Sequence, residues 1–529
     1  MTSRRCSFLA CLALAVAAAV CAQSPARNIQ NSKSRAAGAF DKAVKAGPEA
    51  LRAFLVEFPK GADLHVHLSG AVYAETLLRD AGQDGLCVDP AALSLAQPPC
   101  AGGLVPAAQL SGDIAAANQK LYDRLIDSFS MRSFVPSPGW SGHDQFFAAF
   151  GHFSGLSPAH AAEWVDEVAS RAAAQNEQYL ELMETPPFSH AAGIAHEVGW
   201  TRELAQADLK AFAALRQQLL DKGLRDEVAA GRAEASRAEA QRKQAENCGT
   251  VEAASACAVV VRYIYQVLRG FPPEQVFAQA LLGFETVEAS VAAKDDTWVG
   301  INFVMPEDGF VSMRDYTLQM KMLGFLHSVY PKVHISLHAG ELTLGLVPPE
   351  GLRSHIREAV KLAHAERIGH GVDAMYETNA DALLREMAEG HVMVEVNLSS
   401  NEGILGVKGA EHPFPIYFAS KVPVALSTDD EGVSRIDLTH EYVRAALDYN
   451  LTYDNLKKLA RTGLEHAFLP GDSLWAWPDD FAAPVKACQR QTLGGDTSAA
   501  ECKAFLRGSE KAAAQWELER RLRAFERAF

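Results

Sequence analysis

Two histidines separated by one residue, His65 and His67, are the first residues of this chain whose spacing could do chemistry. In a β-strand, residues i and i+2 point to the same face, so two imidazoles placed in this way can share one metal ion. Leu64, Val66 and Leu68 form the opposite, apolar face, as in a strand that packs one face against helices. An isolated histidine is more often structural, so residues elsewhere in the chain must decide between the two interpretations.

Polar residues also end four later apolar runs. These residues, which lie 32, 27 and 32 positions apart, are His338, His370, Asn397 and Asp429. That spacing is the length of one strand, one helix and two loops. Extending the rhythm toward the N-terminus gives eight expected strands, at 62–68, 179–184, 259–268, 298–306, 333–339, 367–371, 392–397 and 422–428.

The repeated strand and helix pattern predicts an α/β fold, a (β/α)8 TIM barrel. Helical patterns at 353–364 and 380–389 lie between the expected strands. In such a barrel the chemistry lies where the strands end, which is where the polar residues are found here. A doubly wound sheet is the alternative, but no glycine-rich phosphate loop follows the first strand.

The composition fits a single large soluble enzyme. Of the 529 residues, 48% are hydrophobic and 22% are charged, which allows a large core in a chain longer than a plain barrel needs. The net charge of −15 argues against nucleic acids and anionic membranes as partners. No segment after the N-terminus is long and apolar enough to span a membrane.

We expect the extra length to lie in additions to a barrel domain at 59–475. The second insertion should contain one long helix, 201–246, whose last part is rich in Ala, Glu, Arg and Gln and is expected to be solvated. The additions are an N-terminal helical extension at 23–58, insertions at about 86–140 and 201–257, and a C-terminal helical segment at 476–529.

Residues 1–22 have the features of a signal peptide. Arg4 and Arg5 precede an uncharged stretch, and Ala22 ends a small-residue site that a signal peptidase could cleave. We therefore expect a periplasmic or secreted protein, with lipidation of Cys21 as a less favoured alternative. The six later cysteines form local pairs outside the barrel strands, which favours disulfides over six free thiols. The pairs are Cys87 with Cys100, Cys248 with Cys257, and Cys488 with Cys502.

The strand-end residues can be assembled into one hydrolytic metal site. His65, His67 and His338 supply nitrogen ligands, and Asp429 supplies an oxygen. This set suits one Zn²⁺ per chain and, less exclusively, Fe²⁺ or Mn²⁺. Such an ion lowers the pKa of a bound water from 15.7 to about 7. The sequence therefore predicts a metal-dependent hydrolase.

Three residues near the ligands could complete the catalytic machinery. Glu341 could protonate a leaving or ring nitrogen, His370 could orient the attacking hydroxide, and Asp430 could accept a hydrogen bond from the substrate. Glu341 and Asp430 could instead be helix N-caps, since both are predicted to begin helices. Their occurrence together at successive strand ends favours the catalytic interpretation.

Four motifs in this order resemble the adenosine deaminase family of metal-dependent hydrolases. They are His65-Val66-His67, His338-Ala339-Gly340-Glu341, Gly369-His370-Gly371 and Ser427-Thr428-Asp429-Asp430. The resemblance covers about residues 55–470. It implies a zinc barrel that hydrolyses the 6-amino group of adenosine or 2′-deoxyadenosine to an oxo group and releases ammonia.

The resemblance also implies a role for each motif residue. The three histidines and Asp429 would bind zinc, and Asp429 would thus also count among the catalytic residues. Glu341 would protonate the purine ring, His370 would assist the hydroxide, and Asp430 would hold the purine. A cluster of three phenylalanines fits the aromatic patch that the family places over its substrate, although a stripe of this kind is more often core. These are Phe146, Phe147 and Phe150.

Export, paired cysteines and insertions resemble the secreted adenosine-deaminase-related growth factor branch, whose N-terminal extension serves dimerisation, so a homodimer is expected. Two positions depart from the family: Ser69 replaces an acid that contacts the sugar, and Met305 replaces a glycine whose backbone meets the purine. Ser69 should hold adenosine less firmly than an acid and accept a 5′-substituted or even anionic sugar more readily.

Two other function classes stay open at this point. One is another metal hydrolase on the same barrel, or a deaminase of a different aminopurine such as adenine or a 5′-substituted adenosine. The other is a non-catalytic extracellular binding or signalling protein. The intact set of ligands, acid and His370 argues against the second class, because a scaffold needs none of them.

Overall fold

The computed structural model describes residues 25–111, 116–295, 297–497 and 499–529. The expected signal peptide at 1–22, with Arg4, Arg5, Cys21 and Ala22, lies outside the described residues. Among the described helices, α13 (Pro273–Ala293) is long and apolar enough to cross a membrane, but 72% of the relevant window is buried inside the protein. Such burial is typical of a core helix of a barrel.

Eight parallel strands form the central sheet and follow one another in chain order. The first and last strands are joined by a parallel bridge between Val66 and Asp429, so the sheet closes into a barrel. The expectation of an eight-stranded (β/α)8 TIM barrel is therefore confirmed. The strands are β1 (Gly61–His67), β5 (Glu177–Glu184), β6 (Val260–Leu268), β7 (Trp298–Val304), β8 (His334–Ala339), β9 (Arg367–His370), β10 (Met393–Val396) and β11 (Val424–Leu426).

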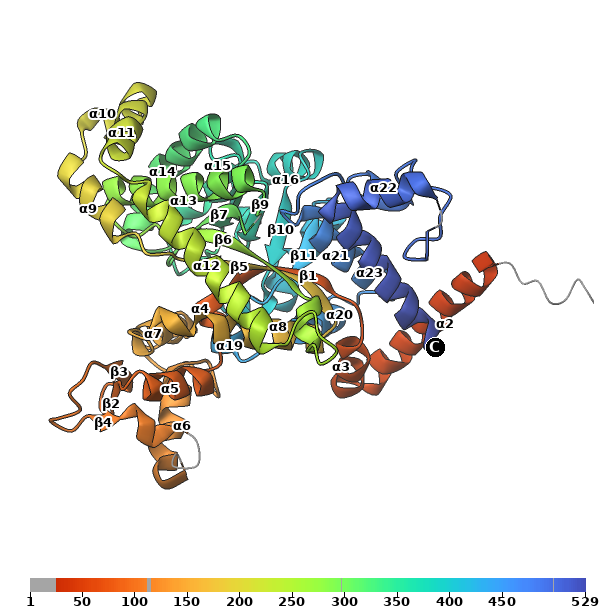
Figure 1. The fold of residues 1–529 in the computed structure, drawn as a ribbon, viewed down its shortest axis with the longest axis horizontal. Helices are drawn as coiled ribbons and strands as arrows, with labels where there is room; N and C mark the ends of the chain where they lie inside the picture. The colour runs from red at the N-terminus through yellow and green to blue at the C-terminus, as the bar shows by residue number, and fades with distance from the viewer. Residues whose placement is uncertain (1–24, 112–115, 296, 498) are drawn as a thin grey trace, which may run out of the picture.

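Helices cover the outside of the barrel (Figure 1). The apolar faces of strands and helices form one continuous core, in which Leu64, Val66 and Ile335 are buried. One expected helix is shorter than predicted, since α15 spans only His355–Lys361. The other covering helices include α8 (Ala161–Ala174), α14 (Phe310–Val329), α16 (Ala380–Glu389), α18 (Phe414–Ala419), α20 (Leu438–Asp448) and α21 (Tyr453–His466).

The two ends of the chain pack together beside the barrel. The N-terminal extension consists of α2 (Pro25–Ala46) and α3 (Pro48–Val56), and α2 lies against the C-terminal helix α23 (Glu510–Arg527) (Figure 1). The C-terminal segment is not wholly helical as expected. It begins with a hairpin of β12 (Trp475–Trp477) and β13 (Asp480–Pro484), followed by α22 (Ala500–Gly508).

The first insertion forms a small unit with its own core, set to one side of the barrel in Figure 1. Helix α5 (Ala74–Gln83) leads into it from β1. Its three short strands pair antiparallel in the order β3-β2-β4. The elements of this unit are β2 (Cys87–Asp89), β3 (Ser94–Ala96), β4 (Val105–Pro106), α6 (Gln119–Ser128) and α7 (Gly142–His152).

The second insertion corrects the expectation of one long helix at 201–246. Backbone breaks at Ala207 (φ 56°) and Gly223 (φ 94°) divide it, and the Asp208 side chain caps a new helix. Its last part is solvated on one face, where Arg237 and Lys243 are exposed, but Arg242 is fully buried on the face that packs against α8 and α13. The helices are α10 (Arg202–Ala205), α11 (Leu209–Asp221) and α12 (Asp226–Ala245), and α9 (Ser189–Val198) precedes them.

The six cysteines of the described chain lie in the three expected local pairs. Their Cα–Cα distances of 5.4, 5.5 and 4.8 Å are in the range that a disulfide requires. The oxidised state in the native protein depends on export and stays a prediction. The pairs are Cys87–Cys100, Cys248–Cys257 and Cys488–Cys502.

Candidate active site

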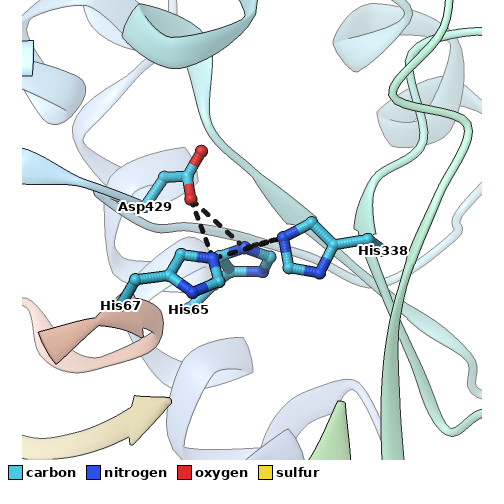
Figure 2. A group of neighbouring side chains, drawn as sticks. All are labelled: His65, His67, His338 and Asp429. Carbon is cyan, nitrogen blue, oxygen red and sulfur yellow. Dashed lines mark hydrogen bonds and ion pairs between the residues drawn. The ribbon is translucent and has the colours of Figure 1, made fainter. Parts of the chain in front are cut away.

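Four buried side chains converge inside the C-terminal end of the barrel (Figure 2). The Nε2 atoms of His65 and His67 each lie 3.2 Å from Nε2 of His338. Oδ1 of Asp429 lies 3.5 Å from Nε2 of His65 and 3.2 Å from Nε2 of His67. Ligand atoms held at 2.0–2.1 Å from a tetrahedral ion are about 3.3–3.4 Å apart. The donor set therefore fits one Zn²⁺ ion.

In each of the three ligand histidines, the hydrogen bond of Nδ1 determines which ring nitrogen carries the proton. Every Nδ1 lies 2.6–2.7 Å from an oxygen that can only accept, so Nδ1 carries the proton and Nε2 presents its lone pair to the centre. Three lone pairs and a carboxylate oxygen facing one point are a suitable set of ligands for a cation. The acceptors are Glu395 for His65, Gln266 for His67 and Asn302 for His338.

Glu395 is a buried carboxylate that stays ionised. Burial opposes its charge, but Arg367 at 2.7 Å and the hydrogen bond with His65 lower the pKa of Glu395 below its ordinary value. The Gln266 amide is also fixed on its other side, because its Nε2 donates to Thr185 Oγ1 at 2.9 Å. The ligands are thus held in orientation by a shell of hydrogen bonds.

Glu341 follows β8 in a loop and does not begin a helix as expected. The carboxylate of Glu307 accepts the backbone N–H of Gly340 at 3.0 Å and that of Glu341 at 2.8 Å, so the backbone is satisfied without a helical turn. The Glu341 side chain is buried. Burial, together with the negative charges of Asp429 and Glu307, raises the pKa of Glu341 well above its ordinary value. A protonated carboxyl group can act as the expected proton donor.

His370 ends β9 beside the ligand set, with its Nε2 3.8 Å from Oδ2 of Asp429. Asn401, on α17 (Leu398–Leu405), donates its Nδ2–H to Nδ1 of His370 at 2.9 Å. The direction of that bond is set by His412, which accepts from the Phe414 N–H at 3.1 Å and donates to Oδ1 of Asn401 at 3.0 Å. His370 therefore carries its proton on Nε2, the nitrogen that faces the ligands.

Burial keeps both His370 and His412 neutral. It lowers the pKa of His370 to about 4 although the charge of Asp429 acts in the opposite direction. It lowers the pKa of His412 to about 3, with a smaller effect from Arg444. His370 is consequently a neutral hydrogen-bond donor at neutral pH.

A cavity of about 320 Å³ opens beside the ligand set. Every site residue predicted from the sequence lines it except His65, which lies fully buried. Asp430 directly precedes the short helix α19 (Glu431–Ser434) as its N-cap residue, but its side chain makes no capping hydrogen bond, contrary to the cap alternative. The predicted residues brought together here are His67, Ser69, Phe146, Phe147, Phe150, Met305, His338, Glu341, His370, Asp429 and Asp430.

Several polar residues of the site were not predicted from the sequence. Gln266, Asn302 and Glu395 are polar residues within otherwise apolar strands, a signal that could have identified them. Asn401 and His412 lie in a helix and a loop, and no spacing in the sequence indicates that they reach His370.

A family model described as Adenosine deaminase matches residues 156–477, more than half of the chain. The chain belongs to this family. It is 33% identical over 137 residues to an adenosine deaminase of Clostridium acetobutylicum, covering 26% of this chain and 38% of the relative. It is 35% identical over 151 residues to one of Escherichia coli, covering 28% and 42%. The aligned part is thus about two fifths of these relatives, and the resemblance to the growth factor branch stays a prediction.

The chain is also similar to several solved structures. An amidohydrolase from Burkholderia ambifaria with bound Zn has a TM-score of 0.52 at 18% identity, covering 80% of this chain and 89% of that one. An adenine deaminase from Arthrobacter aurescens has a TM-score of 0.48 at 16% identity, covering 78% and 95%. The N6-methyl-AMP deaminase from Arabidopsis thaliana has 0.49 at 19%, covering 80% and 95%. The first of these supports the fold.

Proposed function

We propose that this chain is a zinc-dependent hydrolase that deaminates a 6-aminopurine nucleoside, adenosine or 2′-deoxyadenosine. The observation that carries the proposal is the convergence of three imidazole Nε2 atoms and Asp429 at metal-ligand spacing, beside a buried acid in a cavity. A site built from histidines and one carboxylate, without cysteine, is typical of catalytic rather than structural zinc. Membership of the adenosine deaminase family supports the reaction class.

The side chains support one reaction sequence. When bound, the ion would make a water molecule nucleophilic at neutral pH. Nε2–H of His370 points toward the ligand set and can orient the attacking oxygen through a hydrogen bond. Glu341, held protonated by burial, can give its proton to the purine ring. The oxygen of water would then bond to C6, one water proton would pass to the amino group and the other would restore the acid. The C6–N bond breaks and ammonia leaves as the oxo group forms, with no oxidant needed.

We also propose that the protein acts outside the cytoplasm. The supporting observations are the N-terminal pattern of residues 1–22 and three cysteine pairs at disulfide distance. A nucleoside is a substrate that an exported enzyme can meet without a transporter. The homodimer expected from the resemblance stays a prediction.

An ammonia-release assay tests the proposal. The purified full chain, loaded with zinc, is given adenosine, 2′-deoxyadenosine, adenine, AMP and guanosine in turn, and metal content is measured in parallel. We expect the two adenine nucleosides to react. Glu341→Gln should retain zinc and lose about 10²–10⁴ in rate, because it removes one general acid. Glu350→Gln, at an exposed position, is the matched control and should be unaffected.

Two results would contradict the proposal. Ammonia from none of the compounds by a zinc-loaded protein would exclude the reaction. A near-normal rate for Glu341→Gln would exclude the assigned proton donor and leave Glu341 a structural role.

A further inference from the structure

The cavity has a polar inner end and an apolar outer end. The inner end holds the zinc ligands with Glu341, His370 and Asp430, all buried. The outer end is more exposed: Met305 is 36% accessible, and Pro306 beside it is half-buried. Four apolar side chains at the ends of β6 and β7 form this wall, namely Leu268, Val304, Met305 and Pro306. A ligand whose reacting atom is at the zinc site must therefore extend its other end against apolar side chains.

A second part of the cavity lining is aromatic. Phe146, Phe147 and Phe150 of α7 line the cavity, with ring centroids 5.3 and 5.7 Å apart. Their helix is fixed to the barrel on two sides. His143 Nε2 contacts Oδ1 of Asp308, just after β7, at 3.0 Å. The three phenylalanines therefore lie on a helix that is held in position against the barrel.

Close packing against α17 provides the second attachment of α7. A Cβ at Gly142 would lie 1.9 Å from the carbonyl oxygen of Gly403, so only glycine permits this approach of the two backbones. Ser141 and Asp144 form a capping box at the start of α7, which defines where the helix begins. The aromatic wall therefore keeps its position relative to the metal site.

Among the described residues, the cavity lining offers no cationic side chain to a phosphate. It contains neither Lys nor Arg, whereas three of its residues are carboxylic acids. Gln266 is already occupied on both amide atoms by His67 and Thr185. With Gln266 occupied, the neutral polar side chain that remains in the lining is the hydroxyl of Ser69. Recognition of a phosphate dianion generally needs cationic or backbone N–H donors.

Resting on the proposed function, we infer that the preferred substrates are adenine nucleosides whose 5′ carbon bears a small uncharged apolar group, such as 5′-deoxy or 5′-methylthio nucleosides. The ribose of a nucleoside is attached at N9, on the side of the purine remote from C6, so with C6 at the metal site the sugar faces the apolar end. Ser69 lines the same cavity, two residues beyond His67. The 5′-hydroxyl of adenosine would lose water there and gain at most one hydroxyl partner. The hydrolysis at C6 leaves the 5′ group unchanged.

The apolar side chains of the cavity determine how strongly nucleosides with an apolar 5′ group should be preferred. Burying one methylene-sized group contributes a factor of about four, so a methylthio group should raise kcat/KM about tenfold over adenosine. A 5′-phosphate should lower kcat/KM by at least about a hundredfold, because it would be desolvated beside carboxylic acids without a cation. The presence of Ser69 predicted that an anionic sugar would be tolerated. The apolar side chains of the cavity instead disfavour an anionic sugar.

The test compares kcat/KM of the zinc-loaded full chain for five compounds: 5′-methylthioadenosine, 5′-deoxyadenosine, adenosine, AMP and adenine. We expect the first two to exceed adenosine, and AMP to be the poorest of the four compounds that contain a ribose. Ammonia release that favours adenosine, or that is indifferent to the 5′ group, would overturn this inference and leave the proposed function intact. Ammonia release that favours AMP would overturn this inference and the nucleoside assignment, but not the deamination. No ammonia from any of the five would refute the proposed function, and this inference with it.

Two variants examine the walls directly. Phe150→Ser should reduce the ratio of kcat/KM for 5′-methylthioadenosine to that for adenosine, and Ser69→Asp should reverse this ratio by providing a strong acceptor for the 5′-hydroxyl. Leu209→Ser, at an exposed position on α11 outside the cavity, is the matched apolar-to-polar control and should leave the ratio unchanged. An unchanged ratio in both cavity variants would contradict the assignment of this end to the sugar.

Discussion

Replacing Asn401 with aspartate should reverse the hydrogen-bonding direction at His370 while changing the side-chain size very little. In the structure the Asn401 amide donates to Nδ1 of His370 at 2.9 Å, which leaves the proton on Nε2. A carboxylate can only accept, so Nδ1 would take the proton and Nε2 would present a lone pair to Asp429, 3.8 Å away. His412 already donates to the other Asn401 atom and cannot compensate.

The expected loss of activity follows from the role of the His370 Nε2–H donor that the substitution removes. Nε2–H of His370 is the group that the proposed mechanism directs at the attacking oxygen. Removing one preorganised hydrogen-bond donor from an active site costs about 10²–10³ in kcat, equivalent to about 2.7–4 kcal/mol. A catalytic histidine held in the wrong tautomer can cost about 10⁴. We therefore expect kcat of Asn401→Asp to fall by about 10²–10⁴, with little change in KM because Asn401 does not line the cavity.

Steady-state kinetics and zinc analysis on the same samples provide the assay. His412→Gln is the conservative control, because its amide can still donate to Oδ1 of Asn401, and it should keep most of the activity. The reasoning is refuted if Asn401→Asp retains zinc and a near-normal kcat. It is equally refuted if the loss appears as unfolding or as missing zinc, since Asn401 would then have a general structural role.

Three further predictions concern the metal, the pH dependence and the cysteines. Asn302→Leu should lower zinc affinity about 10–100-fold in chelator competition, because Nδ1 of His338 loses its acceptor; unchanged affinity would contradict this. Burial raises the pKa of Glu441 to about 7 although Ser399 and Arg444 act against it, so the folded state keeps a proton that the unfolded state has lost. The free energy of unfolding of wild type should therefore fall, relative to Glu441→Gln, as pH rises from about 4.5 to about 7 in denaturant titrations, and parallel curves would refute the shift. Peptide mapping without reduction of the exported protein should find three local disulfides; free thiols or other partners would refute the pairs Cys87–Cys100, Cys248–Cys257 and Cys488–Cys502.

The barrel and its ligand set could be predicted because their signals are local and repeated. Alternation around His65 and His67 and the spacing of His338 from Asp429 each reflect one strand or one strand-helix unit. Such units have only a few closed arrangements, so the strand ends must meet. Composition and spacing alone were sufficient for this part of the molecule.

Features that depend on contacts between distant segments could not be predicted in the same way. Glu341 was expected to start a helix, but Glu307 from the preceding strand-helix unit satisfies its backbone N–H instead. Asn401 reaches His370 only because α17 turns back over the barrel end. The prediction of a single helix at 201–246 was wrong because long-range packing outweighs the uniform helical propensity of this segment. Asp208, directly before Leu209, is nevertheless a typical N-cap residue that could have indicated a new helix.

The bridge between Val66 and Asp429 gives the order of assembly of the site. The backbone of Asp429 donates to the carbonyl oxygen of His65 at 2.8 Å and accepts from the N–H of His67 at 3.0 Å, so one ligand residue joins the first strand to the last. A nascent or truncated chain that ends before this point has neither a closed barrel nor a fourth ligand. All four proposed zinc ligands can therefore surround one ion only after the fold is complete.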